Sequence, residues 1–424
     1  MPAVEDFLRD NSIETVELAA VDTMGAIRGK RIPVSAFQPG KQFAISSGLY
    51  GLDYGLGVLS TGSYNWANGY PDVFLVPDPA TLRPVPWRPA TALVFCDVVD
   101  RAGQPVPLDP RQILSRAQGQ ARQAGFDPRI GLETEFYLLD PGSLRPRHSR
   151  NPIYSLHDDS YLWPVIREIH SALLAVGMVV EASEAEYGAG QVEINLGHAG
   201  PLAAADDLLF FRYAVKQIAA AHGYLATFMA KPWAESSGSG LHVHQSLWSR
   251  DTGRNAFWDS ETDELSAQGR WYLGGLMQYA AETCYVAVPT PNGYKRSTGY
   301  SFAPTHVTWG LDHRSVAVRA LVHGDGGTRL EQRVAAADAN PYFLVATQLL
   351  AGLAGLDKQL EPPPAATTDV YTATDAEPLP RNVLEAVGPG STTARSHGPA
   401  LGEEVTQLLC LLGQAEQAAS GRGR

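Results

Sequence analysis

The sequence predicts an α+β protein with two domains, and three observations carry this prediction. Predicted strands and long helices follow one another without the strict alternation that a doubly wound α/β sheet requires. Four of the strands carry polar residues at alternate positions, so that one face of a sheet is polar. The proline- and glycine-bearing stretch RAGQPVPLDP separates a small strand-rich region from the remainder. We therefore expect an N-terminal domain over residues 1–103 and a larger domain over residues 104–424.

The N-terminal domain is predicted to consist mainly of strands. Residues 11–34 alternate in character, and Asp22 to Gly25 supply a turn, so this stretch predicts a β-hairpin. Residues 40–69 are rich in glycine and serine and predict a loop that could belong to a site. A stretch punctuated by prolines and the strand TALVFCDVV complete the domain.

The larger domain is predicted to contain several long helices. The first begins at Pro110, where Asp109 can cap it and a proline at the first helical position costs nothing, and it ends near Gly125. Helical periodicity returns over residues 160–176, 201–222, 266–287 and 341–356. The proline- and threonine-rich segment 361–380 predicts a surface loop.

The stretch RIGLETEFYLLD, residues 129–140, is the strand around which the larger domain is organised. Its period of two places Glu133 and Glu135 on one face, and two carboxylates are costly to bury unless a cation or an arginine meets them. An edge strand with two solvent-facing acids is the alternative. The same design recurs downstream in three sets of residues: Gln191, Glu193 and Asn195; His242 and His244; Arg329, Glu331 and Arg333. We therefore predict one sheet with a polar concave face that forms a site.

Composition and charge argue against several classes of protein. A net charge of -12 argues against non-specific binding of nucleic acid or anionic membrane. The cysteines at positions 96, 284 and 410 are far apart and odd in number, so neither a disulfide framework nor a cysteine metal site is indicated. The N-terminus lacks the pattern of a signal peptide, and no apolar run approaches the roughly 18 residues that span a bilayer. We expect a soluble cytoplasmic protein.

The residues on the predicted polar face favour phosphoryl transfer. The face combines glutamates and a histidine pair with a set of arginines: Arg296, Arg314, Arg319, Arg329 and Arg333. Carboxylate-rich ligation suits magnesium or manganese better than zinc, and arginines facing such ions indicate a bridging anion such as phosphate. Neither GAIRGK nor GSGLHVHQ matches a nucleotide-binding fingerprint. A histidine pair or an arginine-rich strand alone is more often structural, so only their joint occurrence indicates a site.

Four blocks in this order resemble the glutamine synthetase superfamily across nearly the whole chain. They are GLETEFYLLD; EYGAGQVEINL with KPWAESSGSGLHVHQSL; NGYKRSTGYSFAPTHVTWGLDHRSVAVR; and RLEQRV leading to ADANPY. The resemblance implies an N-terminal β-grasp domain and a catalytic domain built on a curved antiparallel sheet with flanking helices. It also implies a homo-oligomer of hexameric rings in which neighbouring subunits share active sites. Two rings stacked as a dodecamer are expected, and a single hexamer is the alternative because the C-terminus is shorter than in typical relatives.

The resemblance also implies a role for each matching residue. The ligands of the metal nearer the acceptor would be Glu135, Glu186 and Glu193. Those of the metal on the ATP phosphates would be Glu133, His242 and Glu331, with two or three Mg²⁺ or Mn²⁺ ions per site. The glutamate substrate would be held by Arg296, Arg333 and Gly238, and the transferring phosphate by Arg314 and Arg319. The nucleotide pocket would be lined by His244, Ser246 and Arg329.

Two departures from the family pattern concern the ammonium site. In GYSFAP, Phe302 stands where ammonium-using members carry a glutamate, and in QFAISSG, Ala44 stands where they carry an aspartate. Phe302 cannot accept a proton, so we predict an organic amine as acceptor, as in members similar to γ-glutamylpolyamine and γ-glutamylethanolamide synthetases. Ser237 and His313 each replace an asparagine of the family, and Ser237 leaves room for an analogue of glutamate.

The predicted reaction joins glutamate to an amine with consumption of ATP. ATP would phosphorylate the γ-carboxylate, and the amine would displace phosphate. An ammonium-using glutamine synthetase, with Asp53 or Asp72 replacing the lost acids, is one alternative; a non-catalytic binding protein is another. The amine stays open: a polyamine needs acids along its channel, and an aromatic amine needs apolar walls such as Phe302, Tyr300, Tyr50 or Trp66.

Overall fold

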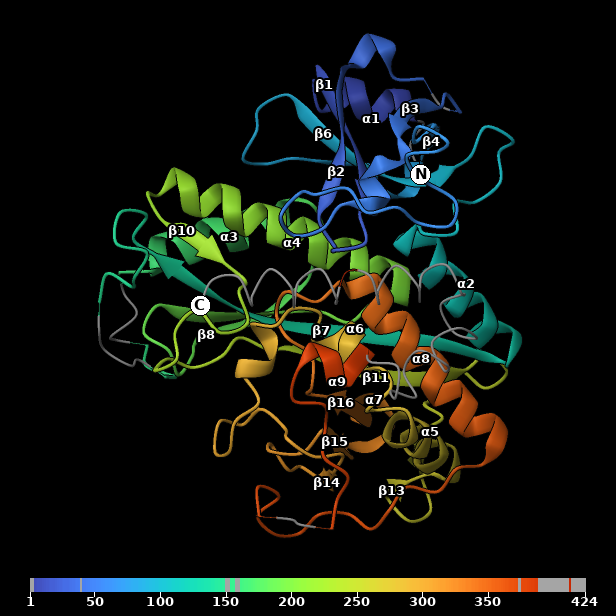
Figure 1. The fold of residues 1–424 in the computed structure, drawn as a ribbon, viewed down its shortest axis with the longest axis vertical. Coiled ribbons are helices and arrows are strands. Elements are labelled where there is room, and N and C mark those ends of the chain that lie inside the picture. The colour runs from blue at the N-terminus through green and yellow to red at the C-terminus, as the bar shows by residue number, and fades with distance from the viewer. Residues whose placement is uncertain are drawn as a thin grey trace.

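The chain is described by a computed structural model over residues 4–38, 40–148, 153–156, 161–372 and 375–387 and at Leu412. Two separate β-sheets organise it. Figure 1 shows a strand-rich N-terminal unit at one end of the long axis and a larger sheet crossing the middle, with helix α4 (Pro201–Ala221) between the two. The described part of the chain is therefore α+β, as the sequence predicts.

The N-terminal unit is a six-stranded mixed sheet. The predicted hairpin is present as β1 (Thr15–Val21) and β2 (Ile27–Pro33), and its turn is held by Asp22, whose Oδ1 accepts from the N–H of Ala26 at 2.8 Å. The strand order is β2-β1-β6-β4-β3, with β5 also paired to β6, and β1 runs parallel to β6. The remaining elements are α1 (Val4–Asp10), β3 (Phe43–Ser46), β4 (Asp72–Pro77), β5 (Arg83–Pro84) and β6 (Thr91–Val99).

The prediction of a loop over residues 40–69 is wrong in part. It contains β3 and a 3₁₀ helix, Ser47–Gly51, which begins where the Ser46 side chain accepts from the N–H of Gly48. Pairing with β4 supplies the backbone hydrogen bonds of β3, and glycine content alone does not reveal such a tertiary partner.

The larger unit contains an eight-stranded sheet in the order β14-β15-β16-β11-β7-β9-β8, with β10 paired to β7. Its strands are β7 (Phe126–Leu139), β8 (Val180–Ala185), β9 (Gln191–Leu196), β10 (Leu225–Thr227), β11 (Leu241–Ser249), β14 (Trp309–Leu311), β15 (Val318–Leu321) and β16 (Arg329–Gln332). The four strands predicted to share a polar face are consecutive neighbours, β16-β11-β7-β9, which confirms that prediction. The expected antiparallel sheet needs one correction, because β14 and β15 run parallel.

The long helices lie where the sequence predicts them, with one exception, and the structure adds the short helices α1, α7 (Gly324–Gly327) and α9 (Val383–Val387), which the sequence does not predict. The other helices are α2 (Pro110–Gln123), α3 (Trp163–Ala175), α4, α5 (Ala267–Gln278), α6 (Cys284–Ala287) and α8 (Pro341–Lys358). The single helix predicted over 266–287 is two, since a turn separates α5 from α6. Asp109 caps α2 as expected, its Oδ1 accepting from the N–H of Arg111 at 3.2 Å. A small hairpin, β12 (Trp258–Asp259) with β13 (Glu264–Leu265), precedes α5.

Strand β7 divides the larger unit into an apolar side and a polar side. Leu132, Thr134 and Phe136 are buried on one face, where the ring of Phe136 packs 6.0 Å from that of Phe211 on α4. Glu133 and Glu135 alternate with them and therefore face the opposite side. Helices α2 and α4 both contact β7, and α4 does so on the apolar side through Phe211, whereas the polar side carries the carboxylates.

Three further observations bear on the sequence predictions. Cys96 and Cys284 are buried free thiols, and Cys410 lies outside the described residues. Among the helices that the structure describes, none is both long and apolar enough to cross a membrane. The described part of 361–380 has no helix or strand, in agreement with the predicted loop.

Candidate active site

A cavity of about 670 Å³ opens on the polar face of the eight-stranded sheet. It brings together most of the residues predicted for the site: Glu133, Glu135, Glu186, Glu193, Gly238, His242, Arg296, Phe302, Arg314 and Arg333. The other predicted residues do not line it and are His244, Ser246, Arg319, Arg329 and Glu331. They adjoin the cavity on β11, β15 and β16.

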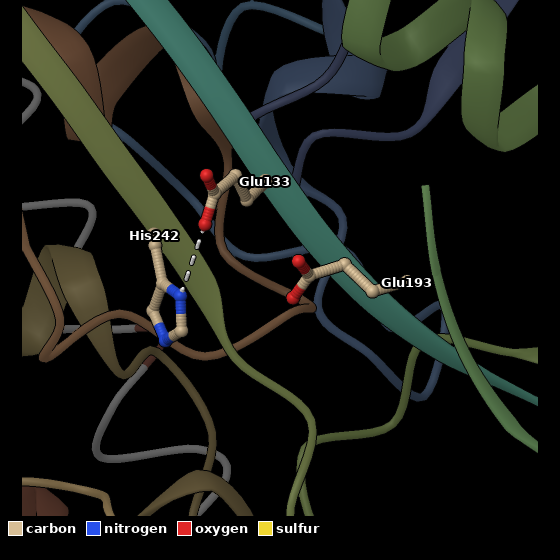
Figure 2. A group of neighbouring side chains, drawn as sticks. All are labelled: Glu133, Glu193 and His242. Atoms are coloured by element: carbon tan, nitrogen blue, oxygen red, sulfur yellow. Dashed lines mark ion pairs between the residues drawn. The ribbon is translucent and has the colours of Figure 1, made fainter. Parts of the chain in front are cut away.

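Carboxylates and imidazoles converge here in three groups, and within each group one ligand atom from each residue lies within 4.8 Å of the others. The groups are Glu133, Glu193 and His242; Glu133, His244 and Glu331; and Glu184, Glu186 and Glu193. Figure 2 shows the first group, with side chains from β7, β9 and β11 pointing toward one shared space. Two groups combine carboxylates with one imidazole and the third has carboxylates alone, and such oxygen-rich sets suit magnesium or manganese.

Strand register explains why residues far apart in sequence meet. Glu133 lies directly opposite His242 on β11 and Asn195 on β9, and Glu135 lies opposite Glu193. Cross-strand partners on one face bring their side chains within about 5 Å. As a result, His242 Nδ1 lies 3.6 Å from Glu133 Oε2. Glu331 on β16 lies opposite His244 and reaches His242 diagonally, with its Oε1 3.5 Å from His242 Nδ1. His244 Nε2 lies 2.8 Å from Glu133 Oε1.

The acids of the site differ in their electrostatic surroundings. Burial, together with the charge of Glu186, raises the pKa of Glu135 to about 8. Burial and the neighbouring glutamates raise the pKa of Glu193 well above its usual range. Glu331 is the opposite case: burial raises its pKa, but the charge of Arg333 together with His242 and His244 outweighs burial and lowers the pKa to about 2. The carboxylates with raised pKa lack enough positive charge around them, and a divalent cation would supply it.

Glu135 and Glu184 are placed differently from what the sequence suggests. Within the described residues, Glu135 belongs to none of the three groups, and its Oε2 accepts from Gln191 Nε2 at 2.8 Å. Glu184, which the sequence analysis missed, lies with Glu186 and Glu193 instead. Its signal was present, since Glu184 and Glu186 are two residues apart at the end of a strand.

Arg296 lines the cavity, and hydrogen bonds to the backbone hold its guanidinium in place. Its Nη1 donates to the carbonyl of Val334 at 2.9 Å and its Nη2 to that of Arg333 at 3.1 Å. Gly238 makes room for it, because a Cβ at this position would lie 2.5 Å from Arg296 Cγ. The loop carrying Gly238 and the guanidinium of Arg296 therefore form one wall of the cavity.

A second cluster adjoins the cavity on β11 and β16. Arg329 Nε donates to His244 Nδ1 at 3.1 Å, while Ser246 Oγ accepts from Trp248 Nε1 at 3.1 Å. Glu331, which is 1% exposed, links this cluster to the cavity through the guanidinium groups of Arg319 and Arg333.

The residues that depart from the family pattern are widely separated. Phe302 lines the cavity, whereas Ala44 lies on β3 of the N-terminal unit opposite Phe74. In the part of the chain that the structure describes, neither Asp53 nor Asp72 lines the cavity. Two of the aromatic candidates also lie outside it, since Tyr50 is buried in the N-terminal unit and Trp66 packs on Tyr70. Tyr300 lines the cavity. Tyr154 and Tyr187 also line it, although the sequence analysis did not single them out.

A cavity lined by carboxylates and arginines is typical of enzymes that bind divalent ions and phosphate groups. Comparison with known families identifies the family. Residues 107–419 match the family described as glutamine synthetase, catalytic domain. The chain therefore belongs to the glutamine synthetase family. It is 37% identical to a glutamate–isopropylamine ligase of Pseudomonas sp, over 91% of this chain and 87% of that protein. It is 34% identical to the γ-glutamylethanolamide synthetase GlnA4 of Streptomyces coelicolor, over 93% and 87%.

A solved structure described as a GmaS/ADP complex has the same fold. It superposes with a TM-score of 0.88 at 30% sequence identity and covers 100% of this chain and 97% of that one. The agreement extends over both units of the chain.

Proposed function

We propose that this chain is an ATP-dependent carbon–nitrogen ligase that joins the γ-carboxylate of glutamate to an organic amine. The observation that carries the proposal is the position of Phe302 on a cavity that otherwise keeps its carboxylates and arginines. Ammonium needs an acid to hold and deprotonate it, and a phenyl ring supplies none. Two similar proteins are named for isopropylamine and for an ethanolamide, which supports an amine as acceptor.

The reaction proceeds in two balanced steps. A γ-carboxylate oxygen of glutamate attacks the terminal phosphorus of ATP, and the bond to ADP breaks, which leaves γ-glutamyl phosphate. The amine nitrogen, having lost one proton, attacks the γ-carbonyl carbon, and the carbon–oxygen bond to phosphate breaks. The products are ADP, phosphate, a proton and the γ-glutamyl amide.

We assign the residues as the family resemblance suggests. By that resemblance Glu135, Glu186 and Glu193 would hold one divalent ion, and Glu133, His242 and Glu331 would hold another, with two or three ions per site. When bound, Mg²⁺ or Mn²⁺ supplies positive charge that offsets the charge on the phosphate oxygens. Arginines of the chain add positive charge to that of the metal ions. Arg314 and Arg319 bind the transferring phosphoryl group. Arg296 and Arg333, together with Gly238, orient glutamate. The nucleotide lies beside His244, Ser246 and Arg329, and the similar structure described as an ADP complex supports a nucleotide site in this fold.

The proposal extends to the organisation of the protein. We assign a β-grasp domain to residues 1–103 and the catalytic domain to residues 104–424, and the family match beginning at residue 107 supports this boundary. Hexameric rings, stacked as a dodecamer, remain a prediction from the family resemblance, and a location in the cytoplasm remains a prediction from the sequence.

The direct test is release of phosphate from ATP in the presence of Mg²⁺ and glutamate, with ammonium compared against a panel of amines. Turnover on an amine but not on ammonium supports the ligase. A preference for ammonium contradicts it and favours a glutamine synthetase. Binding of nucleotide without turnover on any acceptor favours a non-catalytic protein.

A further inference from the structure

We infer that the acceptor is a primary monoamine with a compact apolar substituent, alkyl or aryl, selected by the paired rings of Tyr187 and Phe302. This inference rests on the proposed ligase function and names the acceptor class of the same site. The two rings are in contact at a tilt, with centroids 5.5 Å apart and planes inclined by 32°, and both residues line the cavity.

Both rings keep apolar surface available to a ligand. Tyr187 and Phe302 are each 44% exposed, although each already covers part of the other. Specific small-molecule sites combine apolar walls with a few polar groups, and the apolar walls accept the uncharged part of the ligand. An alkyl or aryl group lying on this pair would remove further apolar surface from water, whereas a chain with a second polar group would gain less, because that group would lose contact with water.

The ring pair adjoins the carboxylates that the amine must approach. Tyr187 follows Glu186 directly, and its backbone N–H donates to Glu186 Oε2 at 3.1 Å. Glu184 and Glu193 lie with Glu186 in one of the three ligand groups. An amine whose nitrogen approaches this acidic end of the cavity therefore has the Tyr187–Phe302 pair as an adjoining apolar surface for its substituent.

The backbone holds Phe302 in an unusual conformation. Its φ is 59°, and that of Tyr300 is also 59°, a left-handed region that bulky side chains rarely adopt. Local bonds maintain it: Ser301 Oγ donates to the carbonyls of Arg296 and Thr298, and Tyr300 Oη donates to Asp369 Oδ2 at 2.9 Å. Strained backbone of this kind persists where surrounding contacts determine it, as they do when a side chain must be positioned for function.

The walls of the cavity argue against a polyamine. A second ammonium group would need a carboxylate beyond the rings. Glu235 lines the described cavity but already accepts from Arg145 Nη1 at 2.7 Å. The other carboxylates of its described lining lie among the candidate metal ligands and beside them: Glu133, Glu135, Glu184, Glu186 and Glu193. A single positive charge next to an apolar group therefore matches this lining best.

The test measures ADP formation with glutamate, ATP and Mg²⁺ on two sets of acceptors. The first compares ethylamine, isopropylamine and benzylamine with ethanolamine and putrescine. The second uses hydroxylamine, which is too small to reach the rings and reports the ligase chemistry as γ-glutamyl hydroxamate. We expect the best apolar monoamine to exceed ethanolamine and putrescine at least tenfold in kcat/KM.

Variants separate contact with the substituent from a structural role. Phe302→Ala and Tyr187→Ala are expected to lower kcat/KM for the apolar amine about tenfold or more while hydroxamate formation changes less than twofold. Tyr187→Phe keeps the ring and retains the preference. Trp163→Ala, a change of a 48% exposed aromatic residue outside the cavity, leaves all acceptors unaffected.

Several results would overturn the inference. A wild-type preference for putrescine or ethanolamine contradicts the apolar acceptor but leaves the ligase intact. Equal losses with apolar amine and hydroxylamine in both alanine variants show that the rings support the fold of the site instead of the substituent. Absence of product with every acceptor, hydroxylamine included, removes the ligase function and this inference together.

Discussion

Arg319 and Glu331 are direct cross-strand partners on β15 and β16, and Arg319 Nη1 lies 3.1 Å from Glu331 Oε2. Glu331 is almost fully buried and also meets the guanidinium of Arg333. One carboxylate proposed to hold a metal ion is thus shared by two arginines proposed to bind substrate. The sheet register therefore couples the proposed metal site to the proposed phosphate site.

Arg319→Lys is expected to lower kcat about 100-fold, because lysine keeps the charge but loses the fork of donors that reaches Glu331 and Asp312 together. Steady-state ADP formation at saturating glutamate and ATP measures kcat. Arg254→Lys, on an exposed ion pair with Asp325, serves as the matched control and should retain full activity. A kcat for Arg319→Lys within twofold of the parent would contradict the role.

Binding of Mn²⁺ is expected to tighten as pH rises from 6 toward 8. The pKa of Glu135 is raised to about 8 by burial and by Glu186, so below that pH the carboxyl holds a proton that a cation must displace. Calorimetry in buffers of different ionisation enthalpy should detect the released proton, and Glu135→Gln should weaken both binding and its pH dependence. Glu235→Gln, in the same cavity but paired with Arg145, should bind Mn²⁺ normally. Affinity independent of pH would show that Glu135 does not participate.

Gly238→Ala is expected to raise KM for glutamate about tenfold with little change in KM for ATP. The new Cβ would lie 2.5 Å from Arg296 Cγ and 3.1 Å from the carbonyl of Ala230, so the guanidinium must move. Gly119→Ala on α2 meets no atom within 4 Å and provides the control with unchanged kinetics. If KM for glutamate stays the same, Arg296 is not the group that orients it.

Arg111→Met is expected to destabilise the protein by about 3 kcal/mol or more. Arg111 is 2% exposed and bonds Asp206, also 2% exposed, together with Asp78 and Asp97 of the N-terminal unit. Its removal leaves a buried carboxylate without its cation. The midpoint of the first thermal transition reports the loss, and adding Asp206→Asn should restore part of it.

An exposed pair provides the control for that measurement. Arg9→Met breaks the surface pair with Asp6 and should shift the same midpoint little. Equal shifts for Arg9→Met and Arg111→Met would refute a special role for Arg111 in joining the two units.

Phe302→Glu is expected to create measurable ammonium-dependent ADP formation. The substitution returns an acid to the position where ammonium-using relatives of this family are expected to carry one, and Phe302 already lines the cavity. Phosphate release with ammonium as acceptor measures the gain, and Phe302→Gln, which has no charge, is its control. Identical behaviour of the two variants would weaken the argument that an acid at this position recruits ammonium.

The sequence alone determined the features that depend on local periodicity. A strand has a period of two, so the spacing of Glu133 and Glu135 was sufficient to place them on one face, and Asp109 before Pro110 marked the start of α2. It misjudged β3, whose pairing with β4 is not local. It also merged α5 and α6, because the apolar pattern continues through the turn between them.

Only the tertiary structure decided which of these residues meet. The strand order β16-β11-β7-β9 brings Glu331 and Glu193 to opposite sides of Glu133. No local sequence pattern encodes this order, because packing among distant segments sets it. The same holds for Glu184, which joins Glu186 and Glu193, and for the ring of Tyr187 against Phe302. The residue types and their spacing were therefore sufficient to predict the kind of chemistry. The shape of the proposed acceptor pocket was not predictable in this way, because it depends on contact between Tyr187 and Phe302, which are more than a hundred residues apart.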